Sequence, residues 1–138
     1  MKKLLSILSI CLVFISCSPD RVHFDEITQK GEISYFEGKP FTGVAFDTHS
    51  NEQLRYEGTF KDGKEDGLSK AWYENGQLYA KSNLKDGKRN GLRKFWHSNG
   101  QLKSEVNWKD GELDGLSKEW YEDGRLEYEE NYKDGVKQ

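Results

Sequence analysis

The stretch GLSKAWYENGQLYAKSNLKDGKRN, from Gly67 to Asn90, decides the fold because the chain repeats it. Moved forward by 24 residues, it becomes GLRKFWHSNGQLKSEVNWKDGELD from Gly91, and then GLSKEWYEDGRLEYEENYKDGVKQ from Gly115. Moved backward, it gives a degraded copy from Gly43, in which Glu52 replaces the turn glycine. A fixed period of this length is typical of a repeat array, in which each unit packs its apolar face against its neighbours.

Glycines mark the corners of each unit, and short segments rich in aromatic residues lie between them. These segments are about seven or eight residues long, which is the length of a strand and too short for a capped helix. Each unit therefore predicts one β-hairpin, and the array predicts an all-β fold, an elongated single-layer antiparallel sheet of stacked hairpins. The structural turn glycines are Gly63, Gly76, Gly87, Gly100, Gly111, Gly124 and Gly135.

The length of the Asn-Gly loop sets which side chains share a face of the sheet. A three-residue loop over 74–76 places Trp72 opposite Leu78, whereas a two-residue loop sends them to opposite faces. The longer loop gathers the apolar residues, and it predicts type I turns closed by a glycine in a bulge, with Gly76 and Gly87 at positive φ.

The same loop predicts one apolar face for all units, and the degraded unit differs at its turn. Glu52 lacks the freedom of glycine at positive φ, so the first full hairpin is expected to have an irregular turn. The apolar face is predicted to hold Leu68, Trp72, Leu78, Ala80 and Leu84, then Leu92, Trp96, Leu102, Val106 and Trp108, then Leu116, Trp120, Leu126, Tyr128 and Tyr132.

Residues 1–16 predict a cleaved secretory signal, because a short basic start precedes the run LLSILSICLVFIS, which is too short for a permanent membrane span. The run ends in Phe14-Ile15-Ser16-Cys17, which resembles the lipobox of bacterial lipoproteins, where the cysteine is acylated and becomes the mature N-terminus. Cys11 leaves with the signal, so Cys17 then has no intramolecular disulfide partner. The alternative is a plain secreted protein in which Cys17 is incidental.

The lipoprotein resemblance implies a location in the bacterial cell envelope. Several acyl chains, at ~0.8 kcal/mol per buried CH₂, anchor a protein stably where one chain does not. Ser18 follows the cysteine in place of Asp, which by analogy with enteric lipoproteins implies the outer membrane. Residues 17–30 are then the lipidated N-terminus and a tether with one capping strand over 22–27. Residues 31–138 form the repeat domain, with a half unit from Tyr35 and units starting at 43, 67, 91 and 115.

Composition restricts the function. Without the two Lys of the signal, 19 Lys and Arg residues face 24 Asp and Glu residues, and the resulting formal charge of −5 argues against nucleic-acid binding. With 34% hydrophobic and 33% charged residues, the chain can cover one side of a sheet but cannot fill a thick core. His23, His49 and His97 are not gathered with a nucleophile or a carboxylate set, so no catalytic residue and no cofactor are predicted.

An oxygen-rich ladder at the Lys-Asp-Gly turns is the strongest candidate for a metal site, because Ca²⁺ binds oxygen ligands of this kind. However, Asp before Gly is what a tight turn requires on its own, and the spacing lacks the dense alternation of calcium loops. No functional metal is predicted. The ladder consists of Asp62, Asp86, Asp110 and Asp134, with Asp66, Asn90 and Asp114 nearby.

The pattern G-L-x-K-x-W-Y-x-N-G-x-L, followed by an aromatic residue and K-D-G-K, resembles the MORN repeat in its bacterial variant over roughly residues 35–135. The resemblance implies stacked hairpins and a non-enzymatic scaffold for an unknown protein partner, and contact with phospholipid has been proposed for the family. Bacterial members are often labelled antitoxins of toxin–antitoxin systems, but that label concerns cytosolic partners and fits an exported lipoprotein poorly. A cell-wall or glycan-binding module is a further alternative, because such modules are also built from aromatic-glycine hairpins.

A stripe of lysines and tryptophans is the candidate binding surface. Each Lys precedes its Trp by two residues, so strand alternation places both on one face. Either the Lys stems simply cover apolar surface, or the stripe receives an acidic peptide or a lipid phosphate. If the stripe is structural, the opposite face, around Tyr73, Tyr79, Phe95 and Tyr121, becomes the candidate. The stripe consists of Lys70, Trp72, Lys94, Trp96, Lys118 and Trp120.

Overall fold

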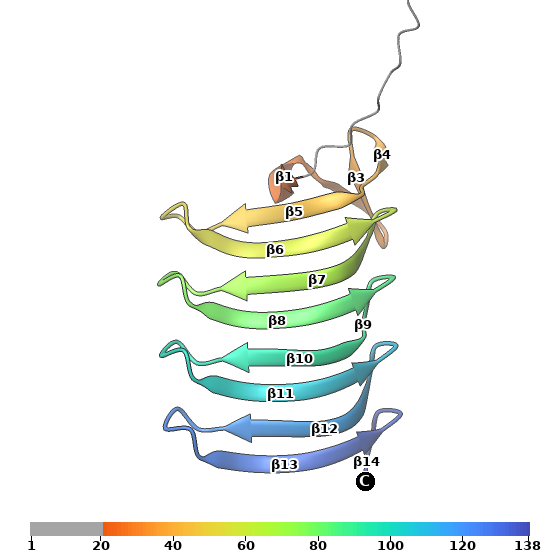
Figure 1. Cartoon of the computed structure of the whole chain (residues 1–138). Helices are drawn as coiled ribbons and strands as arrows, with labels where there is room; N and C mark the ends of the chain where they lie inside the picture. Colours follow the sequence, from red (N-terminus) through yellow and green to blue (C-terminus); the bar gives the residue numbers. More distant parts are fainter. Residues whose placement is uncertain (1–20) are drawn as a thin grey trace, which may run out of the picture.

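The computed structural model describes residues 21–138, and it consists of β-strands apart from one short 3₁₀ turn. The predicted signal, the lipobox and Cys17 lie outside the described residues. Figure 1 shows the strands stacked as a ladder of hairpins that continues from the N-terminal elements to the C-terminus. Within residues 21–138, no helix is long and apolar enough to span a membrane.

The main sheet has 11 strands, and from β5 to β13 they pair antiparallel in chain order, with β9 pairing only with β8. Strand β1 joins one edge, parallel to β5. The prediction of an all-β, single-layer antiparallel sheet of stacked hairpins is confirmed. The strands are β1 (Arg21–His23), β5 (Gly43–Thr48), β6 (Leu54–Lys61), β7 (Lys64–Trp72), β8 (Leu78–Lys85), β9 (Lys88–Arg89), β10 (Gly91–Trp96), β11 (Leu102–Lys109), β12 (Glu112–Trp120), β13 (Leu126–Lys133) and β14 (Val136–Lys137).

The Asn-Gly loop has the predicted three residues. The N–H of Tyr73 donates to the carbonyl of Gln77 at 2.9 Å, and the N–H of Gly76 donates back to the carbonyl of Tyr73 at 2.9 Å. Trp72 consequently pairs with Leu78, and Gly76 adopts a φ of 81°, as predicted.

The first full hairpin closes with the same loop although it lacks the glycine. Glu52 adopts a φ of 66°, and the N–H of His49 donates to the carbonyl of Gln53 at 2.8 Å. The prediction of an irregular turn at Glu52 is wrong. The loop hydrogen bonds, together with Asn51, which accepts the N–H of Gln53 at 3.1 Å, hold Glu52 in a conformation that a non-glycine residue rarely adopts.

The Lys-Asp-Gly turns are of a different kind from the predicted type I turn. Asp86 and Gly87 both have positive φ, 49° and 78°, and Lys85 pairs directly with Lys88. Two central residues with positive φ are the mark of a two-residue type I′ hairpin, whose twist matches that of the flanking strands. The predicted positive φ of Gly87 is confirmed, but the predicted type I turn is wrong here. Asp86 also adopts the left-handed region, which Asp tolerates better than most residues, and this allows the type I′ turn.

Each hairpin contains a bulge that the sequence did not predict. Ala71 pairs with Ala80 and Trp72 with Leu78, so Tyr79 is an extra residue in β8. In a bulge of this kind the extra residue and its neighbour point to the same side of the sheet. Arg55, Lys103 and Glu127 are the extra residues at the equivalent positions of the other hairpins.

The bulge divides the apolar residues between two faces. Leu68 pairs with Asn83, so these two side chains lie on the same face. Ala80 and Leu84 are an odd number of residues from Asn83 along β8, so they point to the opposite face. The prediction of one shared apolar face is therefore wrong for the second strand of each hairpin beyond the bulge, whereas Leu78 lies on the face of Trp72 as predicted. We call the side with Leu68, Lys70 and Trp72 the lysine–tryptophan face. The opposite side, the aromatic face, holds Ala80, Leu84, Val106, Trp108, Tyr128 and Tyr132.

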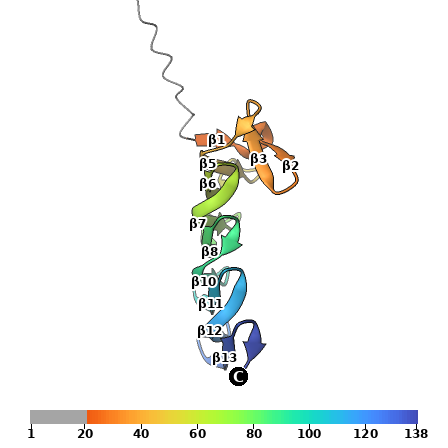
Figure 2. The ribbon, with the colours of Figure 1, turned by 90° about the vertical axis from the view of Figure 1, so that its right-hand side faces the viewer.

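The N-terminal segment folds onto the first hairpin, so the predicted tether is shorter than residues 17–30. Strands β2 (Thr28–Lys30), β3 (Ile33–Phe36) and β4 (Lys39–Pro40) form a second, small sheet, which Figure 2 shows beside one end of the stack. The expected strand over 22–27 ends at His23, where a capping box starts the 3₁₀ turn η1 (Phe24–Glu26). The main apolar core lies here, and it consists of Val22, Phe41, Ala45 and Phe60.

We expect Glu52→Gly to stabilise the protein by about 0.5–1 kcal/mol. Glycine adopts the left-handed conformation without strain, and this gain exceeds the additional backbone entropy that glycine loses on folding. The reciprocal change, Gly76→Glu, should destabilise by a similar amount. Urea unfolding of both variants measures the two effects. A loss of stability in Glu52→Gly would contradict the strain at this position.

Candidate functional site

Hydrogen bonds from each Asn-Gly loop to the next repeat hold the hairpins in register. The hydroxyl of Tyr73 donates to the carbonyl of Trp96 at 2.8 Å, and the amide of Asn75 donates to the carbonyl of Ser98 at 3.1 Å. His49 and His97 occupy the position of Tyr73, with Nε2 lying 2.8 Å from the carbonyl of Trp72 and 2.9 Å from that of Trp120. These two histidines therefore connect repeats.

A second ladder joins the Lys-Asp-Gly turns. The N–H of Gly87 donates to the carbonyl of Glu65 at 2.8 Å, and the N–H of Asp86 donates to the carboxylate of Asp66 at 3.1 Å. Gly63, Gly111 and Gly135 make the same inter-repeat bond, to the carbonyls of Phe41, Arg89 and Leu113.

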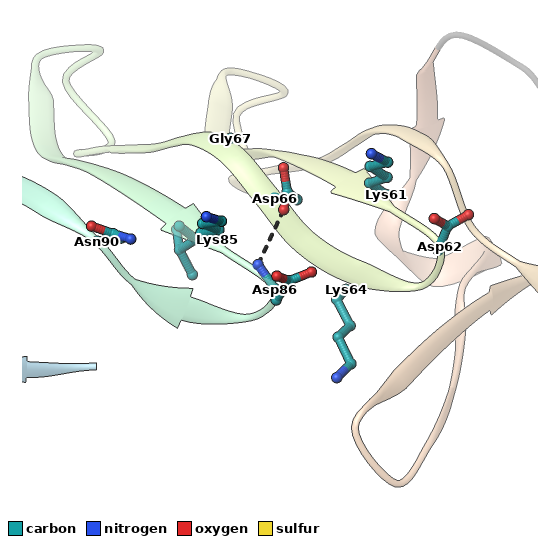
Figure 3. A pocket seen from close by; sticks show the side chains of 9 residues that line it. Lys61, Asp62, Lys64, Asp66, Gly67, Lys85, Asp86 and Asn90 are labelled. Atoms are coloured by element: carbon teal, nitrogen blue, oxygen red, sulfur yellow. Dashed lines mark hydrogen bonds between the residues drawn. The ribbon is translucent and has the colours of Figure 1, made fainter. Parts of the chain in front are cut away.

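The first part of the aspartate ladder lines an open pocket of about 710 Å³ at this edge (Figure 3). Asp62, Asp66 and Asp86 alternate there with Lys61, Lys64 and Lys85. Among residues 21–138, no three His, Cys, Asp or Glu side chains are arranged to hold a metal ion. Asp66 instead serves the next turn as a hydrogen-bond acceptor.

The lysines of the predicted stripe form a row across the strands, but some of their charges are paired with carboxylates. Across the strands, Lys70 pairs with Lys81, which pairs with Lys94. Lys94 is bound to Glu105, with Nζ 2.5 Å from Oε1, and Lys118 is bound to Glu129 at 2.7 Å. Half-buried Trp72, Trp96 and Trp120 follow their lysines on the same strands. Two of the three predicted lysines thus act as cross-strand ion pairs.

The aromatic face carries a cluster of rings, three of which the sequence proposed for the face opposite the stripe, together with guanidinium groups that it did not predict. The ring of Tyr79 lies edge-on between Tyr73 and Phe95, with centroids 5.1 and 5.7 Å away. The guanidinium of Arg93 lies 4.2 Å from the centroid of Phe95. One strand earlier, Arg89 lies 5.0 Å from the ring of Trp108. We call these six residues the aromatic–arginine cluster.

The charges of this cluster are incompletely compensated. Burial, and then the neighbouring cation of Arg89, lower the pKa of the Arg93 guanidinium. Within residues 21–138, the Nε of Arg93 and the indole N–H of Trp108 are buried and have no hydrogen-bond partner. Buried polar groups without partners are rare in folded proteins and often occur at functional sites.

A pocket of about 460 Å³ extends the cluster toward the N-terminal segment. Phe24, Tyr56, Ala71 and Tyr79 are among the residues that line it. Tyr121 lies apart from the cluster and stacks under Arg125 at 5.6 Å. Of the four residues proposed for the face opposite the stripe, the structure brings together Tyr73, Tyr79 and Phe95.

Three consecutive segments, residues 65–86, 89–110 and 113–134, match the family model described as MORN repeat variant. These segments are MORN repeats. Neither a curated protein nor a solved structure matches the chain. Each matched segment spans both strands of one hairpin and ends at the Asp of the following Lys-Asp-Gly turn. The repeats suggest a binding or scaffold module of a family that is generally non-enzymatic.

The arginines of the cluster could have been found from the repeat itself. Arg89 stands where the preceding unit has Glu65, and Arg93 stands where that unit has Ser69. In the preceding unit, Glu65 and Ser69 form hydrogen bonds with the hydroxyl of Tyr56, and Ala80 stands in the place of Tyr56 in the next unit. The two arginines therefore have a role other than that of the residues they replace.

We expect Tyr73→Phe to destabilise the protein by about 1 kcal/mol, because the half-buried carbonyl of Trp96 loses its donor. The matched control is Tyr121→Phe. Tyr121 occupies the same lattice position, but its hydroxyl makes no hydrogen bond within residues 21–138, so this change should be nearly neutral. Thermal or urea unfolding compares the two. Equal losses in both variants would contradict a structural role for the ladder.

We also expect Lys81→Glu to stabilise the protein by about 0.5 kcal/mol, because Lys81 lies directly between Lys70 and Lys94 and like charges at such positions repel. The gain should shrink at high salt, where the charges are screened. Urea midpoints at low and high salt measure it, with Glu105→Lys as the opposite control, which should destabilise. A gain that is independent of salt would show that charge is not its cause.

Proposed function

We propose that this protein is a non-enzymatic, lipid-anchored MORN-repeat module of the bacterial cell envelope, which holds a protein partner against its aromatic face. The aromatic–arginine cluster carries this proposal. Its rings and guanidinium groups belong to the residue types that dominate protein interfaces. Four of the six, Tyr79, Arg89, Arg93 and Phe95, are not required by the repeat, because equivalent positions in other units carry unrelated residues.

The architecture supports a binding role because the sheet stands without a thick core. Beyond the first hairpin, the buried side chains within the described residues are small, namely Ala80, Ser82 and Ser117. Tyr79 remains 41% exposed on the same face. A rigid sheet with exposed aromatic groups is already organised for binding and loses little entropy when a partner arrives.

The lysine–tryptophan face is a weaker candidate. Lys94 and Lys118 are bound to Glu105 and Glu129 across the strands, so a partner would have to break these ion pairs. Within the described residues, Lys70 and Lys81 are the lysines of this row that form no ion pair with a carboxylate. The pairing favours the structural interpretation of the stripe.

Lipidation of Cys17 would place the N-terminal end of the sheet at the membrane. Strand β1 begins at Arg21, so a fully extended connection from Cys17 spans roughly 13 Å. The first hairpin would then lie close to the lipid headgroups, with the three MORN repeats projecting from it. A partner in or near the same membrane would meet the aromatic face.

The test combines membrane fractionation with chemical cross-linking in cells that express the full-length protein. Cys17→Ala should move the protein out of the membrane fraction. Tyr79→Ser should leave it membrane-bound but abolish the cross-linked partner, whereas Lys81→Gln on the other face should retain it. A membrane-bound Cys17→Ala protein would contradict the anchor. An undiminished cross-link in Tyr79→Ser would contradict binding through the aromatic face, and lipid or glycan adducts alone would favour the alternative ligands.

A further inference from the structure

Arg89 and Arg93 differ from the other arginines of the described chain in their partners. Arg21, Arg55 and Arg125 are each bound to a carboxylate. Within residues 21–138, Arg89 and Arg93 have no such partner and lie instead on the rings of Trp108 and Phe95. Two neighbouring cations without an anion repel each other, and a bound carboxylate would relieve this repulsion.

The cluster also lies in the basic part of an acidic chain. Residues 61–109 contain eleven Lys and Arg residues against six Asp and Glu residues, a net charge of +5. Residues 110–138 contain four against ten, a net charge of −6. This separation directs an anionic ligand to the middle of the sheet and away from its C-terminal end.

The N-terminal segment shows how an aromatic residue with acidic neighbours lies on this face. The ring of Phe24 packs edge-on against Tyr56 and Phe60, with centroids 5.8 and 6.2 Å away. Asp25 and Glu26 follow it in the same 3₁₀ turn. A short acidic and aromatic segment is thus already docked on the aromatic face, one repeat before the cluster.

The next repeat carries added positive charge on this face, while smaller apolar residues, Ala80 and Leu84, stand in the places of Tyr56 and Phe60. Moving along the face by 24 residues, Glu65 is replaced by Arg89 and Ser69 by Arg93. The pocket of about 460 Å³ is lined by both Phe24 and Tyr79, and Tyr79 in turn packs on Phe95, the ring that Arg93 stacks on. A side chain of the size of Phe fits a pocket of this volume.

We propose that Arg89 and Arg93 form a carboxylate site that recognises an acidic segment of the protein partner, whose aromatic side chain enters the pocket beside Tyr79. This inference rests on the proposed function and specifies the chemistry of the partner. A guanidinium binds a carboxylate through two parallel hydrogen bonds while its flat face remains stacked on a ring.

The geometry favours a protein segment over a membrane surface. Arg93 is half-buried between aromatic side chains, and its Nε is fully shielded. Lipid phosphates lie in a plane and suit cations that project from a surface, such as long lysines. A recessed guanidinium beside an aromatic pocket is better reached by a peptide side chain.

The experiment titrates the blocked peptide Ac-EDFDE-NH₂ into the ¹⁵N-labelled full-length protein. The reporter is the indole N–H of Trp108, assigned with Trp108→Phe, because it lies beneath Arg89 and has no partner in the described structure. We expect a saturable shift of this resonance. The uncharged peptide Ac-QNFNQ-NH₂ should bind about tenfold more weakly, as expected for the loss of a charge-assisted hydrogen bond.

Two variants and one matched control separate charge at the site from charge in general. Arg93→Gln and Arg89→Gln should each weaken EDFDE about tenfold. Arg89 is exposed, so its variant keeps the test valid if Arg93→Gln does not fold. Lys81→Gln removes the same charge from the opposite face and should bind the peptide as the wild type does.

The carboxylate site is refuted if the Trp108 resonance does not move at several millimolar peptide, or if Lys81→Gln weakens binding as much as the arginine variants. It is also refuted if vesicles of anionic phospholipid, and not the peptide, bind in an Arg89-dependent manner. If the peptide fails while Tyr79→Ser still abolishes the cross-linked partner, the protein-binding function stands and only the acidic chemistry is wrong. If both fail, the proposed function fails as well.

Discussion

Backbone pairing between neighbouring strands and hydrogen bonds between successive turns, and not a large apolar core, hold this sheet together. One ladder runs through the Asn-Gly loops, where Tyr73 binds the carbonyl of Trp96, and another runs through the Lys-Asp-Gly turns, where the N–H of Gly87 binds the carbonyl of Glu65. The buried apolar residues of the described chain are few, and four of the five lie at the N-terminal end. Each repeat is therefore fixed mainly by its neighbours, as expected for a quasi-one-dimensional array.

Because backbone hydrogen bonds, and not an apolar core, hold the sheet together, its two faces can carry different side chains. The lysine–tryptophan face uses its charges in cross-strand pairs, as between Lys118 and Glu129. The aromatic face is covered at one end by the N-terminal segment and carries uncompensated guanidinium groups further along. Because strand pairing and the turn ladders determine the register, substitutions on the aromatic face, such as Arg89 in place of Glu65, can change the chemistry of that face while the hairpins keep the same pairing.

The sequence was sufficient to predict the hairpins, because a period of 24 residues with glycine at the corners permits few other structures. It also gave the three-residue loop, since only that loop places Trp72 opposite Leu78. It could not reveal the bulge at Tyr79. An extra residue occurs at the equivalent position of every unit, so the bulge does not change the period. No glycine marks this position. The error sent Ala80 and Leu84 to the wrong face, and with them Trp108 of the aromatic–arginine cluster. The docking of Phe24 was equally hidden, because it depends on a contact between residues distant in the sequence.

Amide hydrogen exchange at the turn glycines is the measurement that tests most directly whether inter-repeat hydrogen bonds hold the array together. The N–H groups of Gly87 and Gly111 lie at the exposed edge of the sheet, where a simple hairpin turn would leave them open to solvent. If they donate to the carbonyls of Glu65 and Arg89, their exchange should be slower than in an unfolded chain by on the order of 100-fold or more. Exchange at the unfolded rate, with the central strands still protected, would contradict the account.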